Sequence, residues 1–444
     1  MALKSPLPLG SFETITDADA LSRLDFATMT EDQSHGYFVC CDIEYPDNLH
    51  RAHNDLPLVP SLETIEFDQL SLYSKQSLLS AFPHYSSGGY KSKKLVCTFQ
   101  KKERYLCHYL NVQQYLKHGL KVSKLHFVIK FRQMAFVKEY IEVCTELRRS
   151  SLSPFMKNVF KLMCNAIYGM FLLDASKFVE LYFATNRLAA LKRINAPNFK
   201  SLRHFSENLV LILSRKSPVE LNSPVAIGLT VLCLAKRYMN YLFHEELKPK
   251  LTDARLLSTD TDSFIIKFKG KTLEDGLLPI RHLLDTSNVP KEHPWFSMEK
   301  HLTPGWLKEE GCLKKRITRC VFLKSKQYII EQEDRSDNGL ELVKRSKGVA
   351  RSTIGTMDFD LFKRALTQFK PEYSLDSRIQ SFSWRVFTVE NRKLLVSGFD
   401  DKFFIKKCGI HSIPYFSSQL RQISGHDIDE CDECGVNCLK GDLF

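Results

Sequence analysis

The alternation of apolar and polar positions divides the chain into strands and helices, with no internal repeat. Residues 36–46, GYFVCCDIEYP, form an apolar, β-prone run that ends at a proline, which predicts a strand. A serine followed by Pro154 predicts a helix start, and apolar residues over 155–170 then recur at helical spacing. A second helix is predicted over 225–247, with Pro249 just beyond its end. This mixture of elements is typical of α+β proteins.

Two β-hairpins are predicted further along the chain. The β-prone runs 254–258 and 263–268 are separated by four residues, so two acidic side chains, Asp260 and Asp262, stand at the turn. In the second hairpin, QYIIEQ and LELVKR flank an Asn-Gly pair, a strong turn signal. A helix near 359–369 followed by strands is expected in the last hundred residues.

Composition narrows the class of protein. A length of 444 residues exceeds what one hydrophobic core usually organises, so roughly two to four subdomains are expected. Lysine and arginine number 63 against 51 acidic residues, a formal net charge of +12. This excess favours a polyanionic partner such as nucleic acid, although a merely soluble basic protein fits it too.

Cysteine usage and hydropathy indicate the compartment. Thirteen cysteines, an odd number, are scattered over the chain, which argues against a disulfide scaffold and favours a reducing environment. The N-terminus has no apolar core of signal-peptide length, and no apolar run is long enough to span a bilayer. A soluble, intracellular protein without a membrane partner is expected, with cytoplasm and nucleus both open.

The Asp-Thr-Asp turn is the first candidate site. Two aspartates separated by one residue on a tight turn project toward a common point, and like charges that close call for a cation such as Mg²⁺. An isolated Asp-Thr-Asp more often only caps an exposed turn. The flanking apolar strands of LLSTDTDSFIIKF favour the metal hypothesis, because they hold the acids rigidly beside a sheet.

The segment KNVFKLMCNAIYGM is the second candidate site. Lys157 and Lys161 are four residues apart and share a helix face, so they are placed to meet the phosphates of a nucleotide. Asn165 and Tyr168 continue nearly the same face, where the tyrosine ring is placed to stack on a base or sugar, and Gly169 closes the helix. The alternative is an ordinary amphipathic helix with solvated lysines.

Together, KLxxNxxYG and, about a hundred residues later, TDTDS resemble motifs B and C of family B DNA polymerases. The resemblance is greatest to the protein-primed branch of polinton (Maverick) transposons, related viruses and linear plasmids. It covers almost the whole chain, through the segments GYFVCCDIEYPDNLHRAHNDLPLVP, HYLNVQQYLKHGLKVSKLHFVIKFRQ, NSPVAIGLTVLCLAKRYM, KSKQY, KRSKGV and FDDKFFI.

This resemblance implies a right-hand polymerase fold, with an antiparallel-sheet palm, helical fingers and a mixed thumb. The implied divisions are a partial palm (1–50), an insertion like that of protein-primed polymerases with the approach to the fingers (51–145), the fingers and following connection (146–205), the palm with the Asp-Thr-Asp hairpin (206–320), and the late palm, thumb and C-terminal tail (321–444).

It also implies roles for single residues. Asp260 and Asp262 would be the catalytic acids and the ligands of a two-metal centre, with Asp262 shared between the ions. Lys161 would hold the triphosphate, and Tyr168 would abut the incoming nucleotide. The implied DNA contacts are Thr261 in the turn, Lys326 and Tyr328 of a KxY motif at the primer end, and Lys347 in a second basic motif.

The implied activity is template-directed transfer of a nucleotide to a primer by a DNA-directed DNA polymerase that replicates a mobile or viral element. Two Mg²⁺ ions, or Mn²⁺, would activate the primer 3′-hydroxyl and neutralise the leaving pyrophosphate. Primer-template DNA and deoxynucleoside triphosphates are the implied partners, and the insertion adds a terminal priming protein. A reverse transcriptase fits less well, because its motif has adjacent aspartates.

Departures from the family pattern support an alternative. Motif A, which supplies a third carboxylate, is expected just before the first residues, and no exonuclease domain is expected. Asp42 is a candidate substitute, but its tyrosine is wrongly spaced, and a spacing error turns a strand side chain to the wrong face. Ser258, Ala166 and Met170 also depart from the usual residues. The alternative function is therefore a catalytically inactive remnant that only binds nucleic acid.

Two further clusters have weaker interpretations. His426 and three cysteines near the C-terminus have zinc-like spacing, yet a partner pair is missing; the cysteines are Cys431, Cys434 and Cys438. A basic run is placed either to follow a DNA backbone or to form a solvated face; it comprises Lys314, Lys315, Arg316 and Arg319.

Overall fold

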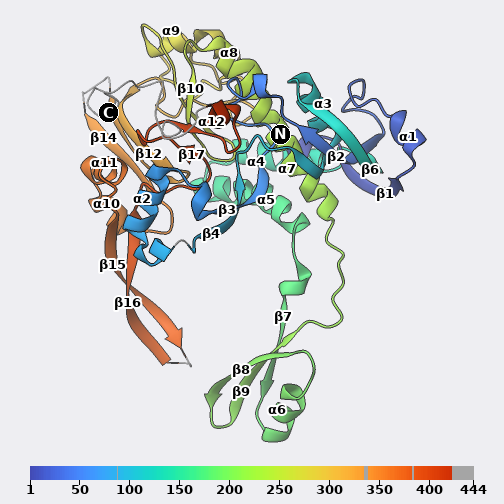
Figure 1. Cartoon of the computed structure of the whole chain (residues 1–444). Helices are drawn as coiled ribbons and strands as arrows, with labels where there is room; N and C mark the ends of the chain where they lie inside the picture. The colour runs from blue at the N-terminus through green and yellow to red at the C-terminus, as the bar shows by residue number, and fades with distance from the viewer. Residues whose placement is uncertain (88, 335–338, 383–384, 423–444) are drawn as a thin grey trace.

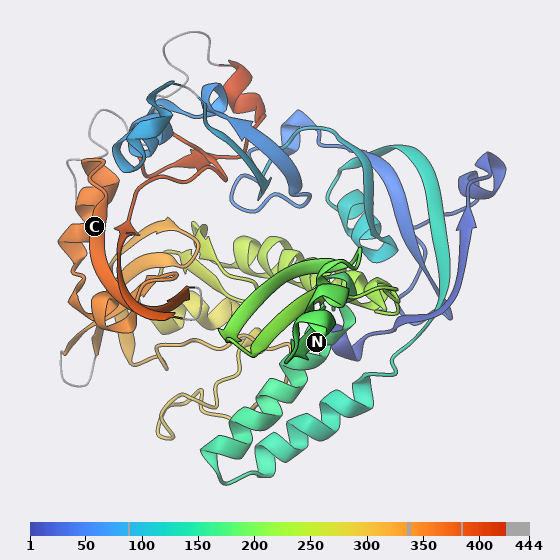
Figure 2. The same ribbon diagram turned by 90° about the horizontal axis from the view of Figure 1, so that it is seen from below.

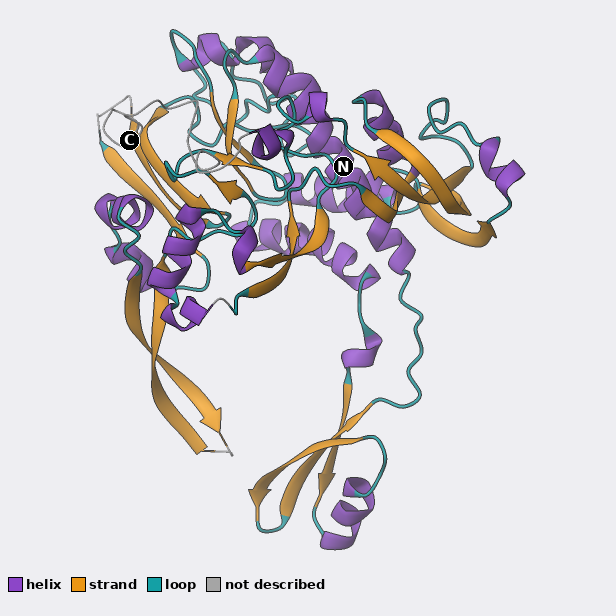
Figure 3. Ribbon diagram, viewed as in Figure 1, coloured by secondary structure: helices purple, strands orange, loops and turns teal. Residues whose placement is uncertain are grey.

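The computed structural model describes residues 1–87, 89–334, 339–382 and 385–422. The C-terminal cluster of His426 and the three cysteines lies outside these residues. Helices and strands are interspersed along the chain, and the strands form several small sheets instead of one large one (Figures 1 and 3). In the described part of the chain, no helix combines the length and apolar character needed to cross a bilayer.

The largest core surrounds a four-stranded antiparallel sheet. Its order is β1 (Leu7–Ile15), β6 (Lys121–Met134), β2 (His35–Glu44) and β5 (Lys102–His108). The predicted strand over 36–46 is thereby confirmed as β2. Side chains such as Val39, Val128 and Ile227 are buried where α3 (Tyr109–Lys117) and α7 (Val225–Tyr241) cover this sheet.

A helix pair projects from this body (Figure 2). It consists of α4 (Lys138–Ser150) and α5 (Pro154–Phe171), which pack against each other. The predicted helix start at Pro154 is confirmed. Gly169 does not end the helix. Two more helical residues follow it, and Leu172 caps the C-terminus of the helix. No residue of α5 is fully buried, so the helix presents most of its surface to solvent.

The segment after α5 forms a small separate unit, which stands away from the body in Figure 1. Its sheet has the order β7-β9-β8, with α6 beside it; the bounds are β7 Val179–Ala184, α6 Arg187–Ile194, β8 Phe199–Ser206 and β9 Leu209–Arg215. A core of its own contains Ala184, Ala190 and Ile212. The sequence pattern does not predict this unit.

The long helix at 225–247 extends further than predicted. After α7 the chain forms one π-helical turn, η6 (Leu242–Leu247), and then a short α8 (Lys248–Lys250). Pro249 therefore lies inside the helical run. It is tolerated because it occupies the first turn of α8, where a missing backbone N–H removes no helical hydrogen bond.

The acidic hairpin follows α8. Strands β10 (Arg255–Thr259) and β11 (Phe264–Lys267) pair antiparallel, with Thr259 opposite Phe264, which confirms the predicted hairpin. Next come α9 (Leu273–Leu277) and the 3₁₀ helix η7 (Leu278–Leu283). The chain then runs without regular structure until β12.

A three-stranded sheet and a long hairpin form the C-terminal half. The sheet order is β12 (Lys315–Lys324), β13 (Gln327–Asp334) and β14 (Leu340–Ser346). The second predicted hairpin is thus confirmed in its strands, while most of its turn lies outside the described residues. The predicted helix near 359–369 is α11 (Phe359–Thr367), which buries Phe362 against β12 and β13. The long hairpin β15 (Glu372–Phe382) and β16 (Arg385–Val396) projects beside it (Figure 1).

Shorter elements complete the fold. They are η1 Ala2–Lys4, α1 Ala18–Ser22, η2 Asp47–Leu49, β3 Ser61–Glu66, η3 Phe67–Gln69, α2 Leu72–Ala81, η4 Pro83–Ser87, β4 Lys91–Val96, η5 Ala175–Lys177, α10 Arg351–Thr356, β17 Phe404–Ile405, β18 Ser412–Ile413 and α12 Ser418–Gln422. Among these, β3 and β4 pair with each other, and they share a core with the segment around Phe404.

Candidate functional site

Hydrogen bonds within the chain itself shape the turn between β10 and β11. The backbone N–H of Asp260 donates to the Ser263 carbonyl at 3.2 Å, and that of Asp262 donates to the Asp260 carbonyl at 2.7 Å. Thr261, between them, has a φ of 62°. A β-branched residue rarely adopts this left-handed conformation, so the surrounding bonds hold a strained turn in place. Asp260 is half-buried and Asp262 is exposed, so both carboxylates reach solvent.

Apolar packing and one acid hold the strands of this hairpin. Phe264 contacts the core that contains Leu242, and the Phe243 and Phe264 rings are 5.9 Å apart. Asp55 lies beside the start of β10, where its carboxylate accepts from the Leu256 N–H at 3.5 Å and lies 3.8 Å from the Arg255 guanidinium. These contacts hold the two strands, and therefore the turn between them, in a defined position.

A lysine from the C-terminal sheet reaches the acidic turn. Lys326 lies between β12 and β13 with a φ of 61°, and its Nζ is 3.4 Å from Oδ1 of Asp260. Its carbonyl accepts from the Lys347 N–H at 3.1 Å, so both basic motifs meet next to the acids. Gln327 fixes this corner by donating from its buried amide to the Leu395 carbonyl at 2.8 Å. The Tyr328 ring lies 5.2 Å from the ring of Phe322, its partner on the neighbouring strand β12.

The α5 residues form a second surface. Lys157, Lys161 and Asn165 are exposed, whereas Tyr168 is half-buried against the main core. Burial raises the pKa of the Tyr168 hydroxyl, which is therefore neutral near pH 7. No hydrogen bond or ion pair in the described chain joins these four side chains to the acidic turn, so the structure leaves their predicted roles untested.

The donor set of the turn suits a hard cation. Mg²⁺ in nucleotide sites is typically held by one or two carboxylates, with waters and substrate phosphates as the other ligands. Asp260 and Asp262 supply two such carboxylates, separated by one residue of a tight turn. Within the described ranges no group of three His, Cys, Asp or Glu side chains is placed to hold a metal. The two acids thus fit a cation that substrate oxygens help to bind.

Asp42, the candidate substitute for the third carboxylate, binds other residues. Its Oδ1 accepts from the Arg104 N–H at 2.8 Å and is 2.6 Å from Nε2 of His126. The Arg104 N–H, followed by the His126 ring, holds the pKa of this carboxyl below its usual range. Asp42 therefore stabilises the pairing of β2 with β5 and β6.

The basic run beside β12 is partly neutralised. Arg319 donates to both oxygens of Glu331, at 2.9 and 2.5 Å, and Lys315 pairs with Glu341. Arg316, by contrast, is exposed and has no ion pair among the residues that the structure describes. The run consequently offers fewer uncompensated charges than its sequence suggests.

Comparison with known proteins places the fold. No family model and no curated protein matches the chain. A crystal structure of phi29 DNA polymerase, in its orthorhombic form, matches with a TM-score of 0.51 at 12% identity, over 89% of this chain and 56% of that one. The chain has a fold similar to phi29 DNA polymerase. Its complex with primer-template DNA and incoming nucleotide substrates matches at a TM-score of 0.48 and 15% identity, covering 89% and 55%.

The similarity to phi29 DNA polymerase supports the expected fold in coarse form, as a mixed α and β architecture over most of the chain. The division into palm, fingers and thumb stays a prediction. The chain spans just over half the length of the polymerase that it matches.

Proposed function

We propose that the chain is the polymerising portion of a DNA-directed DNA polymerase. The observation that carries this proposal is the meeting of Asp260, on the Asp-Thr-Asp turn, with Lys326, of the KxY-like motif, at 3.4 Å. Two motifs that are 64 residues apart in the sequence thus lie side by side, within a fold similar to phi29 DNA polymerase.

In this proposal Asp260 and Asp262 hold divalent ions, Mg²⁺ or Mn²⁺. When bound, such ions supply charge stabilisation for the transferring phosphate and lower the pKa of the attacking hydroxyl. Lys326, whose ammonium already lies beside Asp260, contacts the primer end. Thr261, Tyr328 and Lys347 add contacts to the DNA from the same corner.

The helix pair α4–α5 is proposed as the fingers, and the β10–β11 hairpin as part of the palm. Lys157 and Lys161 then act as point charges toward the triphosphate, because they are exposed on one helix face. Asn165 and Tyr168 continue that face toward the base and sugar. The half-buried Tyr168 is the best fixed of the four, since its ring packs on the main core.

A second candidate is a nucleic-acid-binding protein without catalysis. The observation that favours it is that the turn supplies two carboxylates, and no third acid joins them within the described residues. The net charge of +12 supports DNA binding under either proposal. Protein priming and service to a mobile or viral element rest on the sequence resemblance alone, as does a terminal priming protein as partner.

Primer extension distinguishes the two candidates. Purified chain would be incubated with a labelled primer-template, the four deoxynucleoside triphosphates and Mg²⁺ or Mn²⁺. Extension that Asp262→Asn abolishes supports the polymerase, whereas salt-sensitive DNA binding without extension supports the binding protein. If the chain neither binds DNA nor extends the primer, both candidate functions are contradicted.

A further inference from the structure

The irregular segment between η7 and β12 contains a loop whose two ends are joined. The N–H of Asp285 donates to the Leu307 carbonyl at 2.7 Å, and the N–H of Leu307 donates to the Leu283 carbonyl at 3.0 Å. The Asp285 carboxylate also pairs with Lys308 at 3.0 Å. Residues 285–307 thus leave and rejoin the body at one neck; we call them the neck-closed loop.

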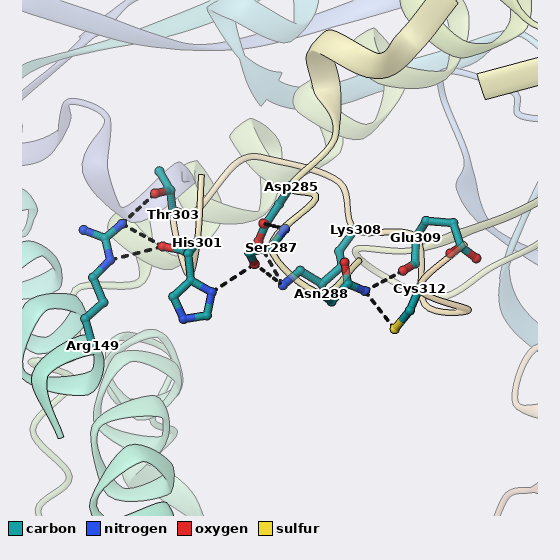
Figure 4. A network of polar contacts seen from close by, with 9 residues as sticks. All are labelled: Arg149, Asp285, Ser287, Asn288, His301, Thr303, Lys308, Glu309 and Cys312. Carbon is teal, nitrogen blue, oxygen red and sulfur yellow. Dashed lines mark hydrogen bonds and ion pairs between the residues drawn. The ribbon is translucent and has the colours of Figure 1, made fainter. Parts of the chain in front are cut away.

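Side chains of the neck-closed loop contact one another and the residues that flank it, which holds the loop in one shape. The Ser287 hydroxyl lies 2.9 Å from Nδ1 of His301 and accepts from Lys308 Nζ at 3.1 Å (Figure 4). Asn288 donates its amide to the Glu309 carbonyl at 2.8 Å. Trp295 is buried within the loop, and the Arg281 guanidinium lies 5.2 Å from its ring centre. These hydrogen bonds and ring contacts give the loop a defined conformation.

The neck-closed loop bonds to the last turn of α4. Arg149 donates from Nε and Nη2 to the His301 carbonyl, at 3.2 and 3.0 Å, and from Nη2 to the Thr303 hydroxyl at 2.6 Å (Figure 4). Three bonds from one planar guanidinium fix both its position and its orientation. The neighbouring Arg148 makes no hydrogen bond to this loop in the described chain.

Arg149 lies where its contact can restrain the orientation of the helix pair. At the base of α4, Lys4 pairs with Glu142 at 2.7 Å. Arg149 lies about 17 Å along the axis from the first residue of α4, at 1.5 Å per residue. It is also next to the connection into α5. A hydrogen bond at the end of α4 that is far from the body restrains rotation of the α4–α5 pair more than an ion pair near the start of α4.

We propose that Arg149 is a positioning residue, which clamps the far end of α4–α5 to the neck-closed loop and so sets where the α5 face stands relative to the Asp260 turn. This inference rests on the proposed function, because α5 carries the residues proposed to bind the nucleotide. The loop follows the acidic hairpin in the chain, after α9 and η7, and bonds to the end of α4, so it links the hairpin to the helix pair.

Hydrogen exchange tests the clamp without reference to catalysis. Full-length wild type would be compared with Arg149→Ala, Arg149→Lys and Thr303→Val, with Arg148→Ala as a control that removes the same charge one residue away. We expect exchange at residues 298–306 and across α5 to rise several-fold in Arg149→Ala, less in the other two variants, and not in the control. Unchanged exchange in Arg149→Ala would overturn the proposal.

Nucleotide kinetics test the positioning role. With primer-template and Mn²⁺, we expect Arg149→Ala to raise KM for the incoming nucleotide about fivefold or more, with the Kd for DNA unchanged and partial recovery in Arg149→Lys. Raised exchange with an unchanged KM would overturn positioning, because the bond would then be structural only. If wild type itself extends no primer, the proposed function fails and the positioning role with it, while the exchange comparison still reports the clamp.

Discussion

Lys326 and Asp260 form an ion pair that joins the C-terminal three-stranded sheet to the acidic turn, with Nζ 3.4 Å from Oδ1. Both side chains are about half exposed, at 51% and 43%, so solvent screens the pair and its contribution to stability is at most about 1 kcal/mol. A substitution of Lys326 can therefore test its proposed role at the primer end with little effect on folding.

Lys326→Met should reduce primer extension by about tenfold or more, because the lost ammonium is proposed to contact the primer end. The free energy of unfolding should change by at most about 1 kcal/mol, since an exposed pair adds little. Urea unfolding and steady-state extension would measure the two effects. Lys315→Met, which removes a paired lysine from the same sheet, is the control. Equal losses of activity in both variants would contradict a specific role for Lys326.

Asp262→Asn should abolish extension and weaken Mn²⁺ binding, because one of two ligand carboxylates is replaced by a poor ligand. Stability without metal should be unchanged or slightly higher, since two like charges no longer share the turn. Mn²⁺ titration followed by electron paramagnetic resonance would measure binding. Asp253→Asn, at the other end of the hairpin, provides the control. Undiminished Mn²⁺ binding in Asp262→Asn would place the cation elsewhere.

Local elements could be predicted because their signals are local. Within a helix, Pro154 fits only the first turn, and the two apolar runs around Asp260 and Asp262 leave four residues for a turn. Pro249 shows the limit of such signals. A proline after a helix usually marks its end, but here it occupies the first turn of α8, which follows the π-helical turn η6 directly.

Contacts between distant segments could not be predicted in this way. Asp55 supports Arg255 and the start of β10, and Arg149 reaches His301, but a charged residue in a sequence carries no signal of its partner. Only the KxY motif identifies Lys326 in the sequence. This motif indicates a role at the primer end but not the ion pair with Asp260, which depends on how the two sheets pack.

Two histidines, His53 and His244, make the fold sensitive to acid. The rings of His53 and His244 are 4.9 Å apart, and His118 lies 5.8 and 5.5 Å from them. Burial, then the neighbouring histidines and Lys248, hold the pKa of His53 at about 4 and that of His244 at about 3. Both folded-state values lie below the unfolded value of about 6.5.

Stability should therefore fall as pH drops from about 6.5 to about 4, because the unfolded chain then binds protons that the folded chain excludes. The expected loss is about 1.4 kcal/mol per pH unit for each histidine in this window. Urea unfolding at pH 7.5, 6.0 and 5.0 would measure it. His244→Gln should have a shallower pH dependence than wild type, and the exposed His84→Gln should not. Identical slopes in all three proteins would contradict a role for this cluster.

DNA binding should depend on uncompensated positive charges and not on the number of basic residues. Arg316 and Arg319 lie on the same strand, but among the described residues only Arg319 of the two has its guanidinium bonded to a carboxylate, that of Glu331. Arg316→Gln should therefore weaken binding to primer-template and lower the salt slope by about one, because one phosphate contact and its released counterion are lost. Arg319→Gln should leave that slope unchanged. Fluorescence anisotropy at several salt concentrations would measure both, and a larger effect from Arg319→Gln would show that the Glu331 pair opens when DNA binds.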